Sequence, residues 1–155
     1  MKLKTVGLPL ALCFFAGAAC FAADDPNMGT WKLNEAKSKT APGMAKLTTV
    51  VYEAVGDQVK CTVDGTDVNG KPLHNEWTGK FDGKDYAVTG DPTSDMRSYK
   101  KIDSHKLKFT VKKGDKTIAT VRIVVAADGK SRTVTARGTD KHGKQFKNVS
   151  AYDKQ

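Results

Sequence analysis

Apolar and polar residues alternate along most of this chain, and short polar turns separate the alternating stretches. Leu107, Phe109 and Val111 alternate with lysine and threonine, and a period of two is typical of a strand with one buried face. The next run, 118–125, is rich in β-branched residues, which favour strands. Asp-Gly and Gly-Asp pairs beside these runs supply the backbone geometry of tight hairpins. The pattern therefore predicts consecutive antiparallel strands.

The same reasoning predicts about ten strands from Met28 onward. Their predicted ranges are 28–33, 46–54, 58–64, 73–81, 85–89, 96–102, 106–112, 118–125, 132–136 and 145–153. Only 34–46 has room for a short helix, and Pro42-Gly43 limits its length. Short strands at regular spacing favour a sandwich or a barrel.

An internal repeat supports a meander of strands. Two segments match without a gap at eight positions and an offset of 73 residues. The shared residues are Gly56, Thr62, Gly65-Thr66-Asp67, Gly70-Lys71 and Asn75 in the first copy, and Gly129, Thr135, Gly138-Thr139-Asp140, Gly143-Lys144 and Asn148 in the second. A meander that closes on itself removes its exposed sheet edges. We therefore predict an all-β fold, a closed antiparallel up-and-down barrel of about eight to ten strands.

The N-terminal stretch has the layout of a secretory signal peptide. Two lysines precede an uncharged apolar run, 6–23, which ends in small residues. We expect cleavage ahead of Ala23, so that residues 1–22 are the signal peptide and residues 23–155 a single domain. That domain is expected to be periplasmic or secreted, without a stable membrane span. The alternatives are an uncleaved membrane helix and a lipoprotein signal at Cys20. Lipoprotein signals favour leucine three positions before the cysteine, and Gly17 occupies that position here, which argues against a lipoprotein.

Removal of the signal peptide changes both the charge and the cysteine count. The formal net charge falls from +9 to +7, and Cys61 is the one cysteine left of three. A single cysteine forms no intramolecular disulfide and no thiolate zinc cage, so the fold rests on packing.

The two ends of the domain resemble a known family. The opening Met28-Gly29-Thr30-Trp31-Lys32-Leu33 is similar to the Gly-x-Trp first strand of the calycins, the lipocalins and fatty-acid-binding proteins. The closing Tyr152-Asp153-Lys154 resembles the last strand of the fatty-acid-binding branch. Segments 77–84 and 149–155 resemble small exported bacterial lipocalin-like proteins. The resemblance implies a barrel that holds a small apolar ligand. Ser150 stands where fatty-acid-binding proteins place a carboxylate-binding arginine, so that recognition mechanism is not expected.

Several segments match part of a known functional motif but lack some of the residues that the motif requires. The loop 65–71 has the spacing of a phosphate loop, but Pro72 follows the lysine and strands flank it, which argues against nucleotide binding. The same loop lacks the first ligand and the helices of a calcium-binding EF-hand. His74-Asn75-Glu76 matches part of a zinc deaminase motif without the two further thiolates. We therefore expect no metal, no cofactor, no catalytic residues and no enzymatic activity, although an enzyme whose groups converge from distant strands is the third hypothesis.

Aromatic residues are the candidate binding residues. Trp31 is predicted to plug the closed end of the barrel under a basic side chain such as Arg137. The predicted cavity lining is Tyr52, Trp77, Tyr99, Phe109, Phe146 and Tyr152. These residues give the preferred hypothesis, a non-enzymatic barrel that binds a small hydrophobic or amphipathic ligand. A barrel filled by its own side chains is the alternative.

Basic residues suggest a second function. Eight of them crowd the segment from 97 to 116: Arg97, Lys100, Lys101, Lys106, Lys108, Lys112, Lys113 and Lys116. Lysines on one strand face attract acidic lipid or polysaccharide of the cell envelope, which defines the alternative function. Nucleic acid is not an expected partner, because Phe109 lies on the opposite strand face from the lysines and offers them no stacking platform. The alternative without a binding function is that these basic residues form an ordinary solvated outer face.

Overall fold

The computed structural model describes residues 25–140 and 142–155, so the predicted signal peptide, residues 1–22, lies outside the described residues. Ten strands follow one another: β1 (Gly29–Lys39), β2 (Lys46–Val55), β3 (Gln58–Thr66), β4 (Pro72–Gly79), β5 (Tyr86–Thr89), β6 (Met96–Asp103), β7 (Lys106–Lys113), β8 (Lys116–Val125), β9 (Ser131–Thr139) and β10 (Gln145–Lys154). Each pairs antiparallel with its neighbours in sequence, and β1 pairs with β10. The predicted closed up-and-down barrel is confirmed.

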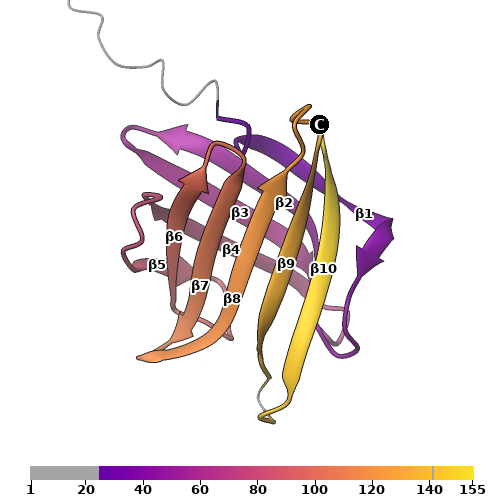
Figure 1. The fold of residues 1–155 in the computed structure, drawn as a ribbon. Helices are drawn as coiled ribbons and strands as arrows, with labels where there is room; N and C mark the ends of the chain where they lie inside the picture. Colours follow the sequence, from indigo (N-terminus) through magenta and orange to yellow (C-terminus); the bar gives the residue numbers. More distant parts are fainter. Residues whose placement is uncertain (1–24, 141) are drawn as a thin grey trace, which may run out of the picture.

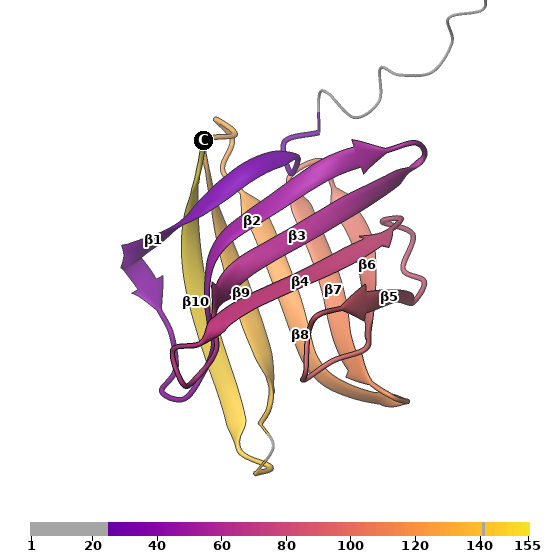
Figure 2. The ribbon, with the colours of Figure 1, turned by 180° about the vertical axis from the view of Figure 1, so that it is seen from behind.

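The strands form two groups that cross at an angle (Figure 1). Strands β6–β10 run nearly side by side, and β1–β5 pass obliquely behind them, as the reverse view shows (Figure 2). Within the described part of the chain there is no helix of the length and hydrophobicity needed to cross a membrane.

The segment with room for a helix is mostly strand. β1 continues to Lys39 through an irregularity between Asn34 and Lys39, where the register with β10 shifts. Ser38 Oγ accepts a hydrogen bond from the Ala151 amide at 2.9 Å, which satisfies a backbone donor at this bulge. The sequence of this segment does not reveal that it is a strand. Its side chains are largely exposed and polar, and only its backbone pairs with the sheet.

The internal repeat corresponds to a repeated structure, β2–β4 and β8–β10. In both copies an aspartate amide binds the carbonyl of the lysine four residues on, Asp67 to Lys71 at 2.8 Å and Asp140 to Lys144 at 2.9 Å. Just before each turn lies a glycine that approaches a neighbouring strand closely. A Cβ on Gly65 would lie 2.1 Å from the Lys46 carbonyl oxygen, and one on Gly138 2.2 Å from that of Ile118. The repeated glycines are therefore steric requirements of the sheet as well as turn residues.

Strand register determines which side chains face the interior of β6–β10. One inward row, made of directly opposed residues, is Tyr99, Phe109, Val121, Ala136 and Asn148. Two outward rows are Lys100, Lys108 and Arg122, and then Ser98, Thr110, Thr120, Arg137 and Lys147. The alternation read from the sequence thus separates an apolar inner face from a basic, hydroxyl-rich outer face.

Candidate functional site

One end of the barrel is closed around Trp31. Its side chain is fully buried, and its Nε1 donates a hydrogen bond of 3.0 Å to the Asn27 carbonyl oxygen. The guanidinium carbon of Arg132 lies 4.5 Å from the centre of the indole, and Lys154 Nζ lies 5.3 Å from it. Both distances fit cation–π contacts, so Trp31 plugs this end beneath two positive charges.

The cation over Trp31 is Arg132, and the prediction of Arg137 is corrected. Arg132 shares its face of β9 with Val134 and Ala136, whereas Arg137 is one residue out of phase and exposed on the outer face. A shift of one position along a strand moves a side chain to the opposite side of the sheet. The plug is therefore Trp31, as predicted, and the cation above it comes from position 132 instead of position 137.

Arg132 has an unusual environment for a charged side chain. It is buried, and its guanidinium carbon lies 5.2 Å from the ring centre of Tyr52 and 5.1 Å from that of Tyr152, in addition to Trp31. Within the described residues, its Nε and Nη1 have no hydrogen-bond partner. Three aromatic faces therefore surround this charge in place of an acidic partner.

The turn that precedes β1 seals the same end. Asn27 is fully buried; its amide and its Nδ2 donate to Asp25 Oδ1 at 2.9 and 2.8 Å. Asp25 in turn pairs with Lys101 at 2.6 Å. Burial by itself raises the pKa of Asp25, but hydrogen bonds from Lys101 and Asn27 outweigh it and lower the pKa. The turn is thus tied to β6 across the end of the barrel.

A cluster of aromatic rings fills the middle of the barrel. Tyr99 is its centre: its ring centre lies 4.2 Å from that of Phe109, 4.4 Å from that of Trp77 and 6.4 Å from that of Tyr52. Phe81 stacks on Trp77 at 6.3 Å. Contacts of this kind stabilise a core beyond the area that they bury.

The structure brings together four of the six predicted lining residues, namely Tyr52, Trp77, Tyr99 and Phe109. Tyr152 lies on the other side of Arg132 and donates its hydroxyl to the Leu47 carbonyl oxygen at 2.9 Å. Phe146 lies away from the cluster on β10, directly opposite Gly138. Tyr52, Trp77, Tyr99 and Tyr152 are all buried, whereas Phe109 and Phe146 remain partly exposed.

Sequence reasoning missed two rings of the cluster, Phe81 and Tyr86. Phe81 falls inside the predicted strand 73–81, but β4 ends at Gly79 and Phe81 follows it. Tyr86 packs edge-on against Trp77 at 5.9 Å between ring centres. Gly79 permits this approach, because a Cβ there would lie 2.5 Å from the Tyr86 ring and 2.6 Å from that of Trp77. The glycine between two aromatic residues was the available signal.

The buried hydroxyl and thiol groups of the interior are held neutral. Burial raises the pKa of Tyr52, of Tyr99 and of the Cys61 thiol, and the nearby positive charges of Arg97 and Arg132 offset this effect only in part. A neutral, fully buried thiol is a poor nucleophile, as expected for a packing residue.

Arg97 is the second arginine of the interior, and it has an acidic partner. Its Nη2 lies 2.9 Å from Asp91 Oδ2, and both side chains are almost completely buried. Asp91 also accepts hydrogen bonds from Ser94 Oγ at 2.6 Å and from Thr93. Burial by itself raises the pKa of Asp91, but these hydrogen bonds and the charge of Arg97 outweigh it and lower the pKa. This network fixes the 91–97 segment beside the aromatic cluster.

The inner face of β8–β10 contrasts with the closed end. Beside larger inward side chains such as Val121 and Val134, a group of small or polar inward residues remains partly exposed: Ala119, Ala136, Gly138, Asn148 and Ser150. These positions are therefore less completely covered than those of the closed end around Trp31. They face inward in the same register as the buried Arg132 and Tyr152.

Polar groups on the outer side of β3 and β4 form a separate ionic group. His74 Nδ1 lies 2.6 Å from Asp64 Oδ1, and Lys60 pairs with Glu76 at 2.7 Å. The hydrogen bond to Asp64 raises the pKa of His74. Among residues 25–140 and 142–155, no group of three or more His, Cys, Asp or Glu side chains has the geometry to hold a metal ion.

Comparison with known proteins adds no family to this picture. A scan against protein-family models gives no match, and a search of curated proteins gives none either. The class that the structure defines is therefore a ten-strand antiparallel barrel with an internal aromatic cluster, compatible with a calycin-like fold.

Proposed function

We propose that this barrel is a non-enzymatic binding protein that holds a small hydrophobic or amphipathic molecule against its inner wall. The observation that carries the proposal is the asymmetry of the interior. The end around Trp31 is sealed, whereas the small inward residues of β8–β10 stay partly exposed. A site of this kind is concave and largely apolar, with few polar groups to orient its occupant.

The polar groups at this wall favour an amphipathic occupant. Asn148 and Ser150 face inward beside Ala136 and Val134, which are their direct partners on β9. The exposed edge of the aromatic cluster at Phe109 completes an apolar surface in the same inward row. A molecule that lies here exchanges water for apolar contact and keeps two hydrogen-bonding side chains for its polar end.

The calycin resemblance supports the same proposal. The Gly-x-Trp strand supplies the buried plug, and the ten-strand meander closes as the resemblance implies. We further propose that the protein acts in the periplasm or outside the cell, after loss of residues 1–22. We do not propose fatty-acid binding through a terminal arginine, since Ser150 occupies that position.

Filling the inner wall tests this proposal. Ala136→Leu adds bulk to the inner face of β9, and we expect it to weaken binding of the best lipophilic ligand at least about tenfold, because overpacking a close-fitting site is costly. The measurement is quenching of tryptophan fluorescence during titration with a panel of fatty acids, sterols and polyenes.

Thr135→Leu is the matched control, because Thr135 lies next to Ala136 on the outer face. It is expected to leave the affinity within about twofold. A wild-type protein that shows no saturable response to any lipophile, or equal losses in the two variants, would contradict the proposal.

A further inference from the structure

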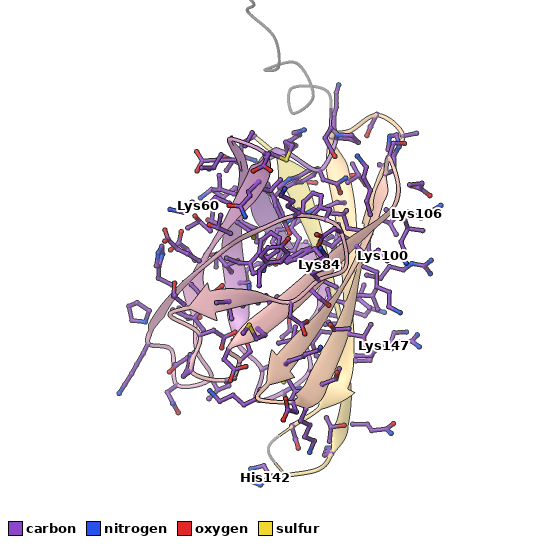
Figure 3. The ribbon with its side chains drawn as sticks, turned by 90° about the vertical axis from the view of Figure 1, so that its left-hand side faces the viewer. Lys60, Lys84, Lys100, Lys106, His142 and Lys147 are labelled. Carbon is purple, nitrogen blue, oxygen red and sulfur yellow. The ribbon has the colours of Figure 1, made fainter. Side chains whose placement is uncertain are left out.

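Positive charge is concentrated on one half of the barrel. Residues 96–155 carry 16 lysines and arginines against 5 acidic residues. The five acidic residues lie in turns or at strand ends: Asp103, Asp115, Asp128, Asp140 and Asp153. The outward strand surfaces between them carry the basic face, defined here as Lys100, Lys108, Arg122, Arg137 and Lys147. Its lysines Lys100 and Lys147 project away from Lys60 on the opposite side of the barrel (Figure 3).

The basic face has one acidic residue among its described strand partners, Asp82, which lies opposite Lys100 in an isolated bridge. All five side chains are exposed, and none forms an ion pair within the described part of the chain. Lys100, Lys108 and Arg122 are directly opposed on three adjacent strands, about 4.8 Å apart from strand to strand. Like charges in that arrangement destabilise a sheet. Folding alone gives no reason for this row, whereas an anionic partner would stabilise it.

Two hollows lie along the basic face. One, of about 520 Å³, is lined by the outward residues Thr120, Arg137, Thr139, Gln145 and Lys147, together with Gly138 and Phe146. The other, of about 170 Å³, is lined by Ser98, Lys100, Lys108, Phe109 and Thr110 on β6 and β7, together with Gly83. Each combines two positive charges and hydroxyl groups with one aromatic ring. The outward row of opposed residues from Ser98 to Lys147 connects them across five strands.

We propose that the basic face binds a linear acidic polysaccharide that lies across β6–β10. An extended polymer brings several carboxylate or sulfate groups to successive cations, and its hydroxyls meet the serine and threonine side chains of both hollows. A lipid bilayer fits this face less well, because binding in the interface uses exposed apolar side chains. Among the described residues, the large hydrophobic side chains exposed on β6–β10 are Met96 and Ile102, both near the ends of β6, and β7–β10 expose none.

Neutralising three lysines tests the proposal. The variant Lys100→Gln/Lys108→Gln/Lys147→Gln is compared with Lys32→Gln/Lys37→Gln/Lys71→Gln, which removes the same charge from exposed lysines before residue 96. The probes are labelled polygalacturonate and heparin oligomers, read by fluorescence anisotropy. We expect salt-sensitive binding that weakens at least about tenfold in the first variant and less than about twofold in the second.

Other outcomes overturn the proposal. Equal losses of affinity in the two variants would mean that the net charge of the protein alone attracts the polysaccharide. Binding to phosphatidylglycerol vesicles without binding to either polysaccharide would mean a membrane surface, and binding to neither probe would leave the basic face without this role. If the first variant does not fold, acetylation of the wild-type protein replaces it. Polysaccharide is then expected to protect Lys108 and Lys147 but not Lys32 and Lys71, and equal reactivity would contradict the proposal.

Discussion

Trp31→Ala is expected to lower the free energy of unfolding by about 3–5 kcal/mol, the usual cost of truncating a buried tryptophan. The change empties the closed end of the barrel and removes the hydrogen bond to Asn27. It also leaves Arg132 without the nearest of the three rings that surround its charge. Urea unfolding followed by far-ultraviolet circular dichroism measures the effect.

Trp31→Phe separates the contributions at this end. Phenylalanine keeps an aromatic face for Arg132 but loses the Nε1 donor, so a smaller loss of about 1–2 kcal/mol is expected. If alanine at position 31 costs less than about 0.5 kcal/mol, the end around Trp31 is not the closed core that the contacts indicate.

Asp91→Ala is the second large effect that we expect. It leaves the Arg97 charge buried without its partner, and breaking such a pair costs about 3–5 kcal/mol. The double variant Asp91→Ala/Arg97→Met is expected to be more stable than Asp91→Ala alone, because it removes the unpaired charge too. Urea unfolding of the three proteins at neutral pH measures this, and a double variant no more stable than Asp91→Ala would contradict it.

The lowered pKa of Asp91 also gives this pair a pH dependence. A carboxyl group whose pKa is lower in the folded state stabilises the protein above its ordinary pKa, and this stabilisation is lost as pH falls through the lowered value. Asp91→Asn is therefore expected to flatten the fall in stability below about pH 4. Asp115→Asn, in an exposed turn, is the control for the loss of one carboxylate, and equal flattening in the two variants would contradict the role of Asp91.

The local pattern of apolar, polar and turn residues was sufficient to predict the architecture. The alternation around Leu107 and Phe109 and the Asp-Gly turns specify strands and hairpins, and a hairpin places neighbouring strands side by side. A chain of such hairpins has few ways to protect its two edges, so closure into a barrel follows. The bulged end of β1 was missed, because pairing of its backbone leaves no trace in exposed polar side chains.

The interior was predicted less completely, because ring contacts join strands that are distant in sequence. Tyr52, Trp77 and Tyr99 face inward by their own strand periods, and their meeting depends on how the two groups of strands cross. The inward position of Arg132 could have been predicted, since it lies on the same face of its strand as Val134 and Ala136. The strand period could not place Phe81, because this residue follows the end of β4, so Gly79 between Trp77 and Phe81 was the available signal.

The most direct test of the binding proposal is the position of a bound ligand. Nuclear Overhauser effects between the protons of the tightest lipophile and the protein should involve the Ala136 methyl group and the Phe146 ring. Both side chains face inward at the accessible wall of β9 and β10. Contacts confined to outward residues such as Thr135 would contradict a site inside the barrel.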